Sequence, residues 1–315
     1  MTYSTASTQT PASAGHGLVA QPGSGTDITL TTADGTQLAA TLFTPSMPAL
    51  AGDGKQQWIV VGCATAVPRG FYTRFAQYAA SRGLHVITTD YRGIGGSKRG
   101  PLKGFVMDYS DWSRYDLAAA VDYAAARGKV WMVGHSLAGH AIGQLPNHSL
   151  LEAAYVCGTG AGWHGWMPRP ERYRAWAMWH VLGPITTRIF GYHPMSKFGM
   201  GEDLPMGAYR DWKRDCQFPR YFFDGSDRER YISAFAQVKI PIAAAVSTDD
   251  LWAPPASRDA FFEAFSGTHV QHIDFLPAQL GVQQVGHMGY YRKEAGAVLW
   301  PQMIKWLVQH GLAPR

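Results

Sequence analysis

A short apolar run that ends in a serine between small residues is the feature that most constrains the fold. Residues 129–139 read Lys-Val-Trp-Met-Val-Gly-His-Ser-Leu-Ala-Gly. This pattern predicts a buried strand that turns sharply at Ser136 and continues as a helix, which requires very small flanking residues. The turn lifts the Ser136 hydroxyl clear of the sheet and directs the backbone N–H of Leu137 to the same point. We therefore expect a nucleophile and one oxyanion donor here, although Ala138 stands where glycine is commoner.

Apolar runs alternate with amphipathic segments on both sides of this turn. An Asp34-Gly35 turn between alternating residues predicts a hairpin over residues 27–43. Buried strands are expected at residues 57–62, 84–90, 129–133, 153–157, 240–247 and 270–276, and helices at 71–82, 111–127 and 297–310. Strands that alternate with helices predict an α/β fold with a mostly parallel, doubly wound sheet.

The alternation breaks between residues 162 and 231. This segment carries five tryptophans, numerous arginines and no strand pattern. We interpret it as a cap subdomain inserted over the carboxyl ends of the strands, where open α/β sheets bind ligands. The predicted organisation is a disordered leader over residues 1–25, a core formed by residues 26–161 and 232–315, and a cap over residues 162–231.

Composition excludes several classes of protein. The net charge of +5 is modest, and no run of Lys or Arg resembles a nucleic-acid or membrane anchor. No apolar run reaches membrane-spanning length, and the leader lacks a signal-peptide pattern. The unevenly spaced Cys63, Cys157 and Cys216 favour a reducing compartment, so we expect a cytoplasmic protein. The sequence leaves open whether the protein forms a homodimer. Glu202 and Asp203 lack partners at metal-ligand spacing, so no metal is predicted.

A serine nucleophile needs a base, usually a histidine that a carboxylate orients. His287 is the candidate base, because it lies in a glycine-flanked loop, Val-Gly-His-Met-Gly, after the last strand. Asp249 and Asp250 both follow the preceding strand. We favour Asp250, which stands four residues before Pro254, and expect Asp249 to cap the loop.

The remaining site residues are less constrained. The second oxyanion donor should come from the loop after residue 61, as the backbone N–H of Ala64 or Thr65. Trp163 and Trp166 follow closely on the strand that ends at Cys157, so we expect them to bind substrate. Trp252 and Met288 complete the predicted substrate-binding set.

The order Ser136, Asp250, His287 is similar to that of the α/β-hydrolase superfamily. Residues 90–97, Asp-Tyr-Arg-Gly-Ile-Gly-Gly-Ser, look like that fold's loop after its fourth strand, and residues 286–291, Gly-His-Met-Gly-Tyr-Tyr, look like its histidine loop. Most closely, the chain from about residue 27 to its end, including Gly-Glu-Asp-Leu-Pro at 201–205, resembles bacterial predicted hydrolases near the serine-aminopeptidase-like lipolytic enzymes. The resemblance implies an α/β-hydrolase fold with a Ser-His-Asp triad.

These residues predict a serine hydrolase that cleaves carboxylic esters through an acyl-enzyme, with a small-molecule ester as substrate and no cofactor. An acyltransferase, or an amidase or peptidase, would use the same three residues. A ligand-binding protein that keeps the fold and pocket is the alternative from another class, and the complete set of Ser, His and Asp argues against it.

Overall fold

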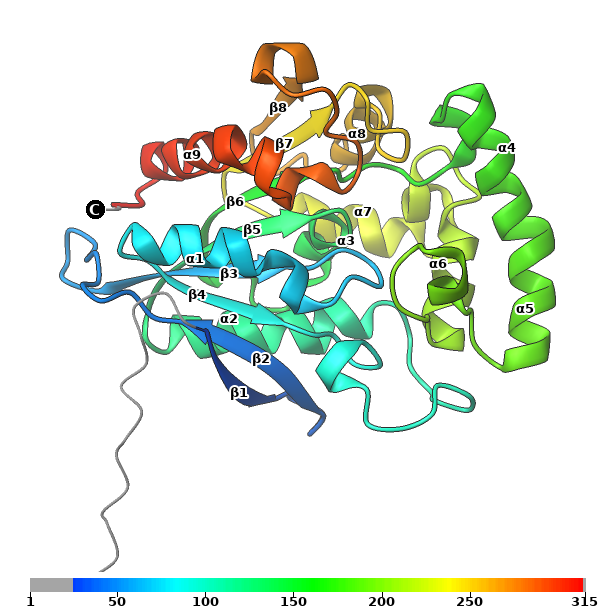
Figure 1. Ribbon diagram of the computed structural model, residues 1–315, viewed down its shortest axis with the longest axis horizontal. Helices are drawn as coiled ribbons and strands as arrows, with labels where there is room; N and C mark the ends of the chain where they lie inside the picture. Colours follow the sequence, from blue (N-terminus) through cyan, green and yellow to red (C-terminus); the bar gives the residue numbers. More distant parts are fainter. Residues whose placement is uncertain (1–24, 314–315) are drawn as a thin grey trace, which may run out of the picture.

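An eight-stranded sheet forms the centre of the molecule in the computed structural model, which describes residues 25–313 (Figure 1). Its strand order is β1-β2-β4-β3-β5-β6-β7-β8. The hairpin strand β2 pairs with β1 and with β4 in antiparallel orientation, and every later pair is parallel. The strands are β1 (Gly25–Thr31), β2 (Gln37–Phe43), β3 (Gln56–Gly62), β4 (His85–Thr89), β5 (Gly128–His135), β6 (Leu151–Cys157), β7 (Ile242–Ser247) and β8 (Val270–Phe275).

Helices cover both faces of this sheet. α1 and α9 pack together on one face, and α2 lies on the opposite face (Figure 1). The α-helices are α1 (Thr73–Ser81), α2 (Ala118–Ala125), α3 (Leu137–Ala141), α4 (Arg169–Ala177), α5 (Gly183–Phe190), α6 (Met206–Asp215), α7 (Arg228–Ala236), α8 (Pro255–Phe262) and α9 (Lys293–Gln309). The prediction of a mostly parallel, doubly wound α/β sheet is confirmed.

The central strands are buried on both faces, as their continuous apolar runs predict. All six residues of β7 are buried, and β3 is buried from its second residue onward. A strand covered on both sides cannot alternate polar and apolar residues, because the polar side chains of one face would then be buried without hydrogen-bond partners. Because β5, β7 and β8 run parallel in this sheet, their carboxyl ends lie along one edge.

The helix expected at residues 111–127 begins differently from the prediction. Residues Trp112–Leu117 form a π-helical stretch before α2. From this stretch Trp112 Nε1 donates to the Arg92 carbonyl at 3.0 Å, and the buried Asp116 accepts from the Arg92 backbone N–H at 2.7 Å. Both residues therefore secure the Arg92 peptide, a packing constraint that the apolar spacing does not reveal.

The segment expected to be a cap is helical. α4, a π-helical stretch over Met178–Leu182, and α5 form one continuous run at the outer edge of the molecule (Figure 1). The expected boundary at residue 231 falls within α7, whose Phe235 packs against Phe261 of α8 with ring centroids 5.9 Å apart.

The first 24 residues of the expected leader lie outside the described residues, and Gly25, its last residue, begins β1. Within residues 25–313, none of the helices combines the length and apolar character needed to cross a bilayer.

Candidate active site

The backbone between β5 and α3 turns at Ser136. This residue has φ 51° and ψ −102°, in a region that non-glycine residues rarely occupy. The surrounding strand holds it there, because its N–H donates to the Cys157 carbonyl at 2.8 Å and its own carbonyl accepts from the Thr159 hydroxyl at 2.7 Å. The strain is therefore balanced by backbone and side-chain hydrogen bonds from the end of β6.

Two glycines make room for this turn. A Cβ atom on Gly134 would lie 2.7 Å from the Ala138 methyl, and a Cβ on Gly62 of the neighbouring strand would lie 2.5 Å from the same methyl. Both distances are far shorter than a carbon–carbon contact. Ala138 thus fits where glycine is commoner because Gly62, at the end of β3, has no side chain. Gly62 and Ala138 therefore compensate for each other sterically.

The structure brings Ser136, His287 and Asp250 together at the carboxyl edge of the sheet. Ser136 Oγ lies 3.1 Å from His287 Nε2, and His287 Nδ1 lies 2.9 Å from Asp250 Oδ2. In this arrangement the Ser136 hydroxyl donates to Nε2 and Nδ1–H donates to the carboxylate. The imidazole is thereby oriented toward the serine hydroxyl, an arrangement that nucleophilic catalysis requires.

Asp250 is buried and is held by several donors besides His287. Its Oδ1 accepts from the backbone N–H groups of Trp252 and Ala253, each at 2.9 Å, and its Oδ2 accepts from the Tyr290 hydroxyl at 3.0 Å. Burial alone would raise the pKa of Asp250, but the neighbouring His287 and these hydrogen bonds lower that pKa below its ordinary value. The carboxylate therefore stays ionised beside the imidazole.

Asp249 has a different position from its neighbour. Its carboxylate accepts from the backbone N–H groups of Val285 and Gly286, both at 2.9 Å, in the loop that precedes His287. Gly286 has φ 56°, a left-handed conformation that favours glycine. Asp249 thus fixes the loop that carries His287, and only Asp250 contacts the imidazole.

His135 connects the two sides of the site, a role that sequence reasoning missed. Its Nε2 lies 2.8 Å from the His287 carbonyl and its Nδ1 lies 3.0 Å from the Tyr72 hydroxyl. A carbonyl only accepts, so Nε2 carries the proton and Nδ1 accepts from Tyr72. Burial lowers the pKa of His135 to about 3, which keeps the ring neutral. Its place next to Ser136 was the only available signal.

The Tyr72 hydroxyl also distinguishes the two expected oxyanion donors. It accepts from the Ala64 backbone N–H at 2.8 Å. The N–H groups of Thr65 and Leu137 have no acceptor in residues 25–313. Thr65 lines the same cavity as Ser136, and Leu137 follows Ser136 directly. These two N–H groups, and not that of Ala64, are available to a developing negative charge.

Residues 199–202, which belong to the segment expected to form a cap (residues 162–231), form hydrogen bonds that hold the loop that carries Thr65. The Glu202 backbone N–H donates to the Ala66 carbonyl at 2.8 Å, and the Glu202 carboxylate accepts from the Gly95 N–H at 2.7 Å. Ala66 has φ 59°, so its conformation needs such support. On the other side, the Thr65 hydroxyl lies 2.6 Å from the Tyr109 hydroxyl. The loop is thus held from two directions.

A cavity of about 300 Å³ opens over Ser136 and His287. Of the four residues expected to bind substrate, Trp252 and Met288 line it, whereas Trp163 and Trp166 do not. Trp163 and Trp166 pack on each other instead, with ring centroids 5.9 Å apart, and Trp166 Nε1 donates to the Pro219 carbonyl. The remaining apolar side chains of the lining are Ala64, Val67, Met195, Met200 and Trp212, and Arg292 also contributes to it.

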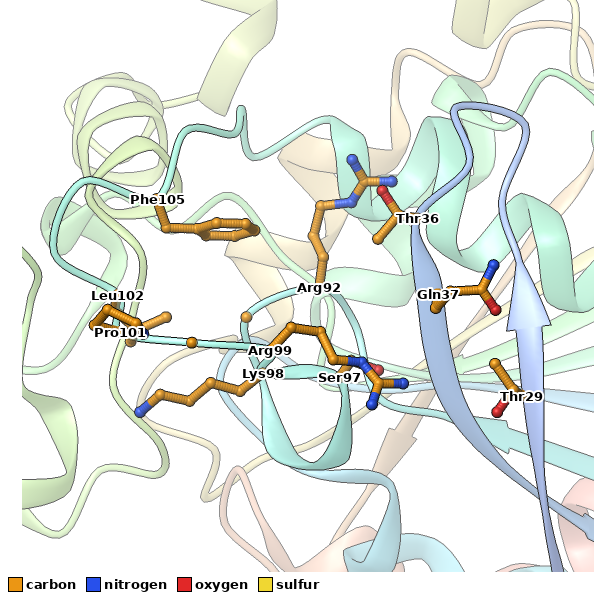
Figure 2. Close-up of a pocket in the computed structure, with 12 residues that line it drawn as sticks. Thr29, Thr36, Gln37, Arg92, Ser97, Lys98, Arg99, Pro101, Leu102 and Phe105 are labelled. Atoms are coloured by element: carbon orange, nitrogen blue, oxygen red, sulfur yellow. The ribbon is translucent and has the colours of Figure 1, made fainter.

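A larger cavity of about 640 Å³ lies elsewhere, between the β1–β2 hairpin and residues 97–105 (Figure 2). Figure 2 shows the Arg99 guanidinium directed toward Gln37 and Thr29, and the Lys98 amine directed the other way. The Arg92 side chain in this cavity is fully occupied by Asp34 and Asp116. Its lining holds no pair of nucleophile and base, so the smaller cavity is the candidate active site.

Metal-binding geometry is not found in the part of the chain that the structure describes, where no three His, Cys, Asp or Glu side chains are grouped to hold an ion. Glu202 and Asp203, the acidic pair noted in the sequence, have local partners. Glu202 bonds Gly95 as described, and Asp203 accepts from the Ser196 hydroxyl at 2.6 Å. Both carboxylates therefore hold the loop around residues 196–203 in place through these hydrogen bonds.

Comparison with known proteins identifies relatives of this architecture. The sequence profile of the alpha/beta hydrolase family matches residues 37–297. No curated protein sequence matches the chain. Among solved structures, an esterase from Thermogutta terrifontis is 16% identical with a TM-score of 0.54, covering 91% of this chain and 100% of that one. A monoglyceride lipase variant from Saccharomyces cerevisiae is 13% identical with a TM-score of 0.62, covering 90% and 95%. Puromycin hydrolase is 17% identical with a TM-score of 0.59, covering 91% and 39%.

The compensation between Gly62 and Ala138 is testable by a double-mutant cycle. Gly62→Ala alone should destabilise the protein by about 1–3 kcal/mol, because two methyl groups cannot occupy the same space. The double variant Gly62→Ala/Ala138→Gly should recover most of that loss. Denaturant unfolding of the wild type, both single variants and the double variant measures the coupling free energy. Additive free-energy changes would contradict the proposed contact.

Proposed function

The chain belongs to the alpha/beta hydrolase family, and we propose that it is a serine hydrolase that cleaves small carboxylic esters. Ser136 is the proposed nucleophile, His287 the general base and Asp250 the residue that orients His287. The observation that carries this proposal is the continuous set of hydrogen bonds from Ser136 Oγ through the imidazole to a buried carboxylate. A protein that only bound ligands would have no need of this arrangement.

In the proposed acylation step, Ser136 Oγ attacks the ester carbonyl carbon while His287 Nε2 takes the hydroxyl proton. The carbonyl oxygen becomes negatively charged and accepts from the N–H groups of Leu137 and Thr65. Collapse of this intermediate breaks the bond to the alkoxy oxygen, which leaves as the alcohol after receiving the proton from His287. Asp250 stabilises the imidazolium during both transfers.

Water completes the proposed cycle. It attacks the acyl carbon while His287 Nε2 takes one of its protons, and the resulting intermediate expels Ser136. The proton returns to the serine, and the products are a carboxylic acid and an alcohol. Each step uses residues of the chain and water, so the proposed reaction requires no cofactor.

The cavity supports small acyl groups. Its volume of about 300 Å³ corresponds to roughly ten groups the size of a water molecule, at about 30 Å³ each. Methionine and tryptophan side chains form most of its apolar lining, and flexible methionines adapt to acyl groups of different shape. We further propose that residues 162–231 act as a cap, because Met195, Met200 and Trp212 of this segment contribute to that lining.

Replacing the nucleophile tests the proposal directly. Ser136→Ala should fold normally and lower kcat/KM on p-nitrophenyl butyrate by at least about 10³-fold, because the attacking oxygen is lost. A fluorophosphonate should add its mass to the wild type and not to the variant. A variant that keeps a tenth of the wild-type rate would exclude Ser136 as nucleophile. An unlabelled, inactive wild type would favour a ligand-binding protein.

The two neighbouring aspartates provide a matched comparison. Asp250→Asn should lower kcat far more than Asp249→Asn, because only Asp250 holds the imidazole in the required tautomer. Asp249→Asn removes one of the acceptors that position residues 285 and 286, so its effect on kcat should be smaller. Steady-state kinetics on one ester measures both. If Asp249→Asn proved the more damaging change, the roles of the two residues would have to be exchanged.

Acyl-chain preference tests which tryptophans shape the cavity. Each methylene that becomes buried should raise kcat/KM about fourfold, from about 0.8 kcal/mol per group, until the cavity is full. Trp212→Ala should move the optimum toward longer chains, because it enlarges the lining. Trp166→Ala, outside the cavity, serves as the control and should leave the optimum in place. A series of p-nitrophenyl esters from acetate to decanoate measures both profiles. An identical profile in Trp212→Ala would exclude this residue from acyl binding.

A further inference from the structure

The outer helix of the cap segment exposes a row of large apolar side chains. α4, the Met178–Leu182 stretch and α5 form one run over residues 169–190. Five of the fifteen exposed large hydrophobic residues of the described chain lie in these 22 positions. Ile185 and Ile189 are 54% and 66% exposed, and Tyr173 is 65% exposed. The other two members of this apolar row are Trp176 and Val181.

This concentration is unusual for a surface helix. The opposite side of the run is already buried, through residues such as Ala175, Trp179 and Thr186. The helix therefore has the apolar contacts that it needs for packing, and the exposed row is additional. Single apolar residues on a surface need no explanation, but a contiguous row on one element marks an interaction site. Figure 1 places α4 and α5 at the outer edge of the molecule, so the exposed side chains of this run lie on its periphery.

The charged side chains along the same run are predominantly positive. Arg174 and Arg188 are exposed beside the apolar row. Glu171 is the only carboxylate of residues 169–190, and its Oε2 lies 3.5 Å from Arg174. Lys197 continues the basic character beyond the end of α5, with its amine 5.5 Å from the centre of the Phe190 ring. The partner of this face should therefore be apolar and negatively charged.

These features point to a membrane surface and not to a second copy of the chain. A two-fold dimer through this face would bring Arg174 and Arg188 of both copies together, with no free carboxylate from the run to pair with them. An anionic bilayer instead offers acyl chains to the apolar row and negative headgroups to the arginines. At about 1.5 Å per residue, the run is roughly 33 Å long, which suits a helix lying flat in the interface.

We propose that residues 169–190 dock the protein reversibly on anionic lipid bilayers, with Trp176, Ile185 and Ile189 entering the headgroup region. The helix lies in the plane of the surface and does not cross it. This inference is independent of the proposed ester hydrolysis, because none of these residues lines the cavity over Ser136. Ser136→Ala should therefore bind vesicles as the wild type does.

The test is co-sedimentation of the full chain with sucrose-loaded vesicles. We expect the wild type to bind vesicles of 70% phosphatidylcholine and 30% phosphatidylglycerol, and to bind pure phosphatidylcholine at least tenfold more weakly. Binding should weaken in 0.5 M salt, because the arginine contacts are screened. Ile185→Glu/Ile189→Glu should lose at least tenfold in partition coefficient.

A matched control separates this face from a general effect of added charge. Val298→Glu/Val308→Glu places two carboxylates on exposed aliphatic positions of α9 and should leave vesicle binding unchanged. Both double variants should keep the circular-dichroism spectrum and the thermal unfolding midpoint of the wild type, which shows that they fold. The proposal is overturned if the wild type stays in the supernatant, or if both double variants lose binding equally. It is also overturned if the wild type is a dimer that Ile185→Glu/Ile189→Glu dissociates, since the row would then be a self-association face.

Discussion

The contact between Ala138 and the two glycines beneath it is the constraint on which the candidate site depends. Ser136 keeps its strained backbone only where β5 and α3 approach closely, and that approach leaves no space for side chains at Gly62 or Gly134. A larger residue at either glycine would push α3 away from the sheet. The Leu137 N–H at the start of α3 would then move together with the serine hydroxyl. One steric condition thus controls both the proposed nucleophile and one proposed oxyanion donor.

Buried hydrogen bonds extend this control to the remaining parts of the site. The neutral His135 joins Tyr72, which holds the loop after β3, to the carbonyl of His287. Asp249 clamps the same histidine loop from the other side. A buried network in which every member has a partner is rigid, because opening any bond leaves a polar group unsatisfied. The base and the loop that carries Thr65 are therefore positioned relative to one another by the core and not by substrate.

The proposed cap, residues 162–231, contributes to the site in two different ways. Its residues 199–202 bond the strained loop at Ala66, so the cap and the loop that carries Thr65 are mechanically connected. Its side chains Met195 and Trp212 narrow the cavity over Ser136. The outer run over residues 169–190 takes no part in either contact and presents its apolar row away from the core. One part of residues 162–231 thus lines the cavity over Ser136, whereas residues 169–190 expose apolar side chains to the solvent.

Local chemistry in the sequence determined the elements and the candidate residues. Continuous apolar runs required a doubly covered parallel sheet, and a serine between small residues at the end of one run required the sharp turn. The order of Ser136, Asp250 and His287 along the chain follows from the same reasoning, because the first two stand just after strands and His287 lies in the loop that follows the last strand. The carboxyl ends of these strands meet the same edge. These signals depend on residues that are close together in the sequence, so they can be recognised without a structure.

Only the tertiary structure decided which of several equivalent groups faces the site. Ala64 and Thr65 are alternatives in sequence, and the Tyr72 hydroxyl, eight residues further along the chain, accepts the hydrogen bond from the N–H of the first. Trp166 and Trp212 are both tryptophans of one irregular segment, yet one bonds the Pro219 carbonyl and the other lines the cavity. The physical reason is the same in each case. A local pattern fixes what a side chain or N–H can bind, but its partner is set by segments that are brought together only when the chain is packed.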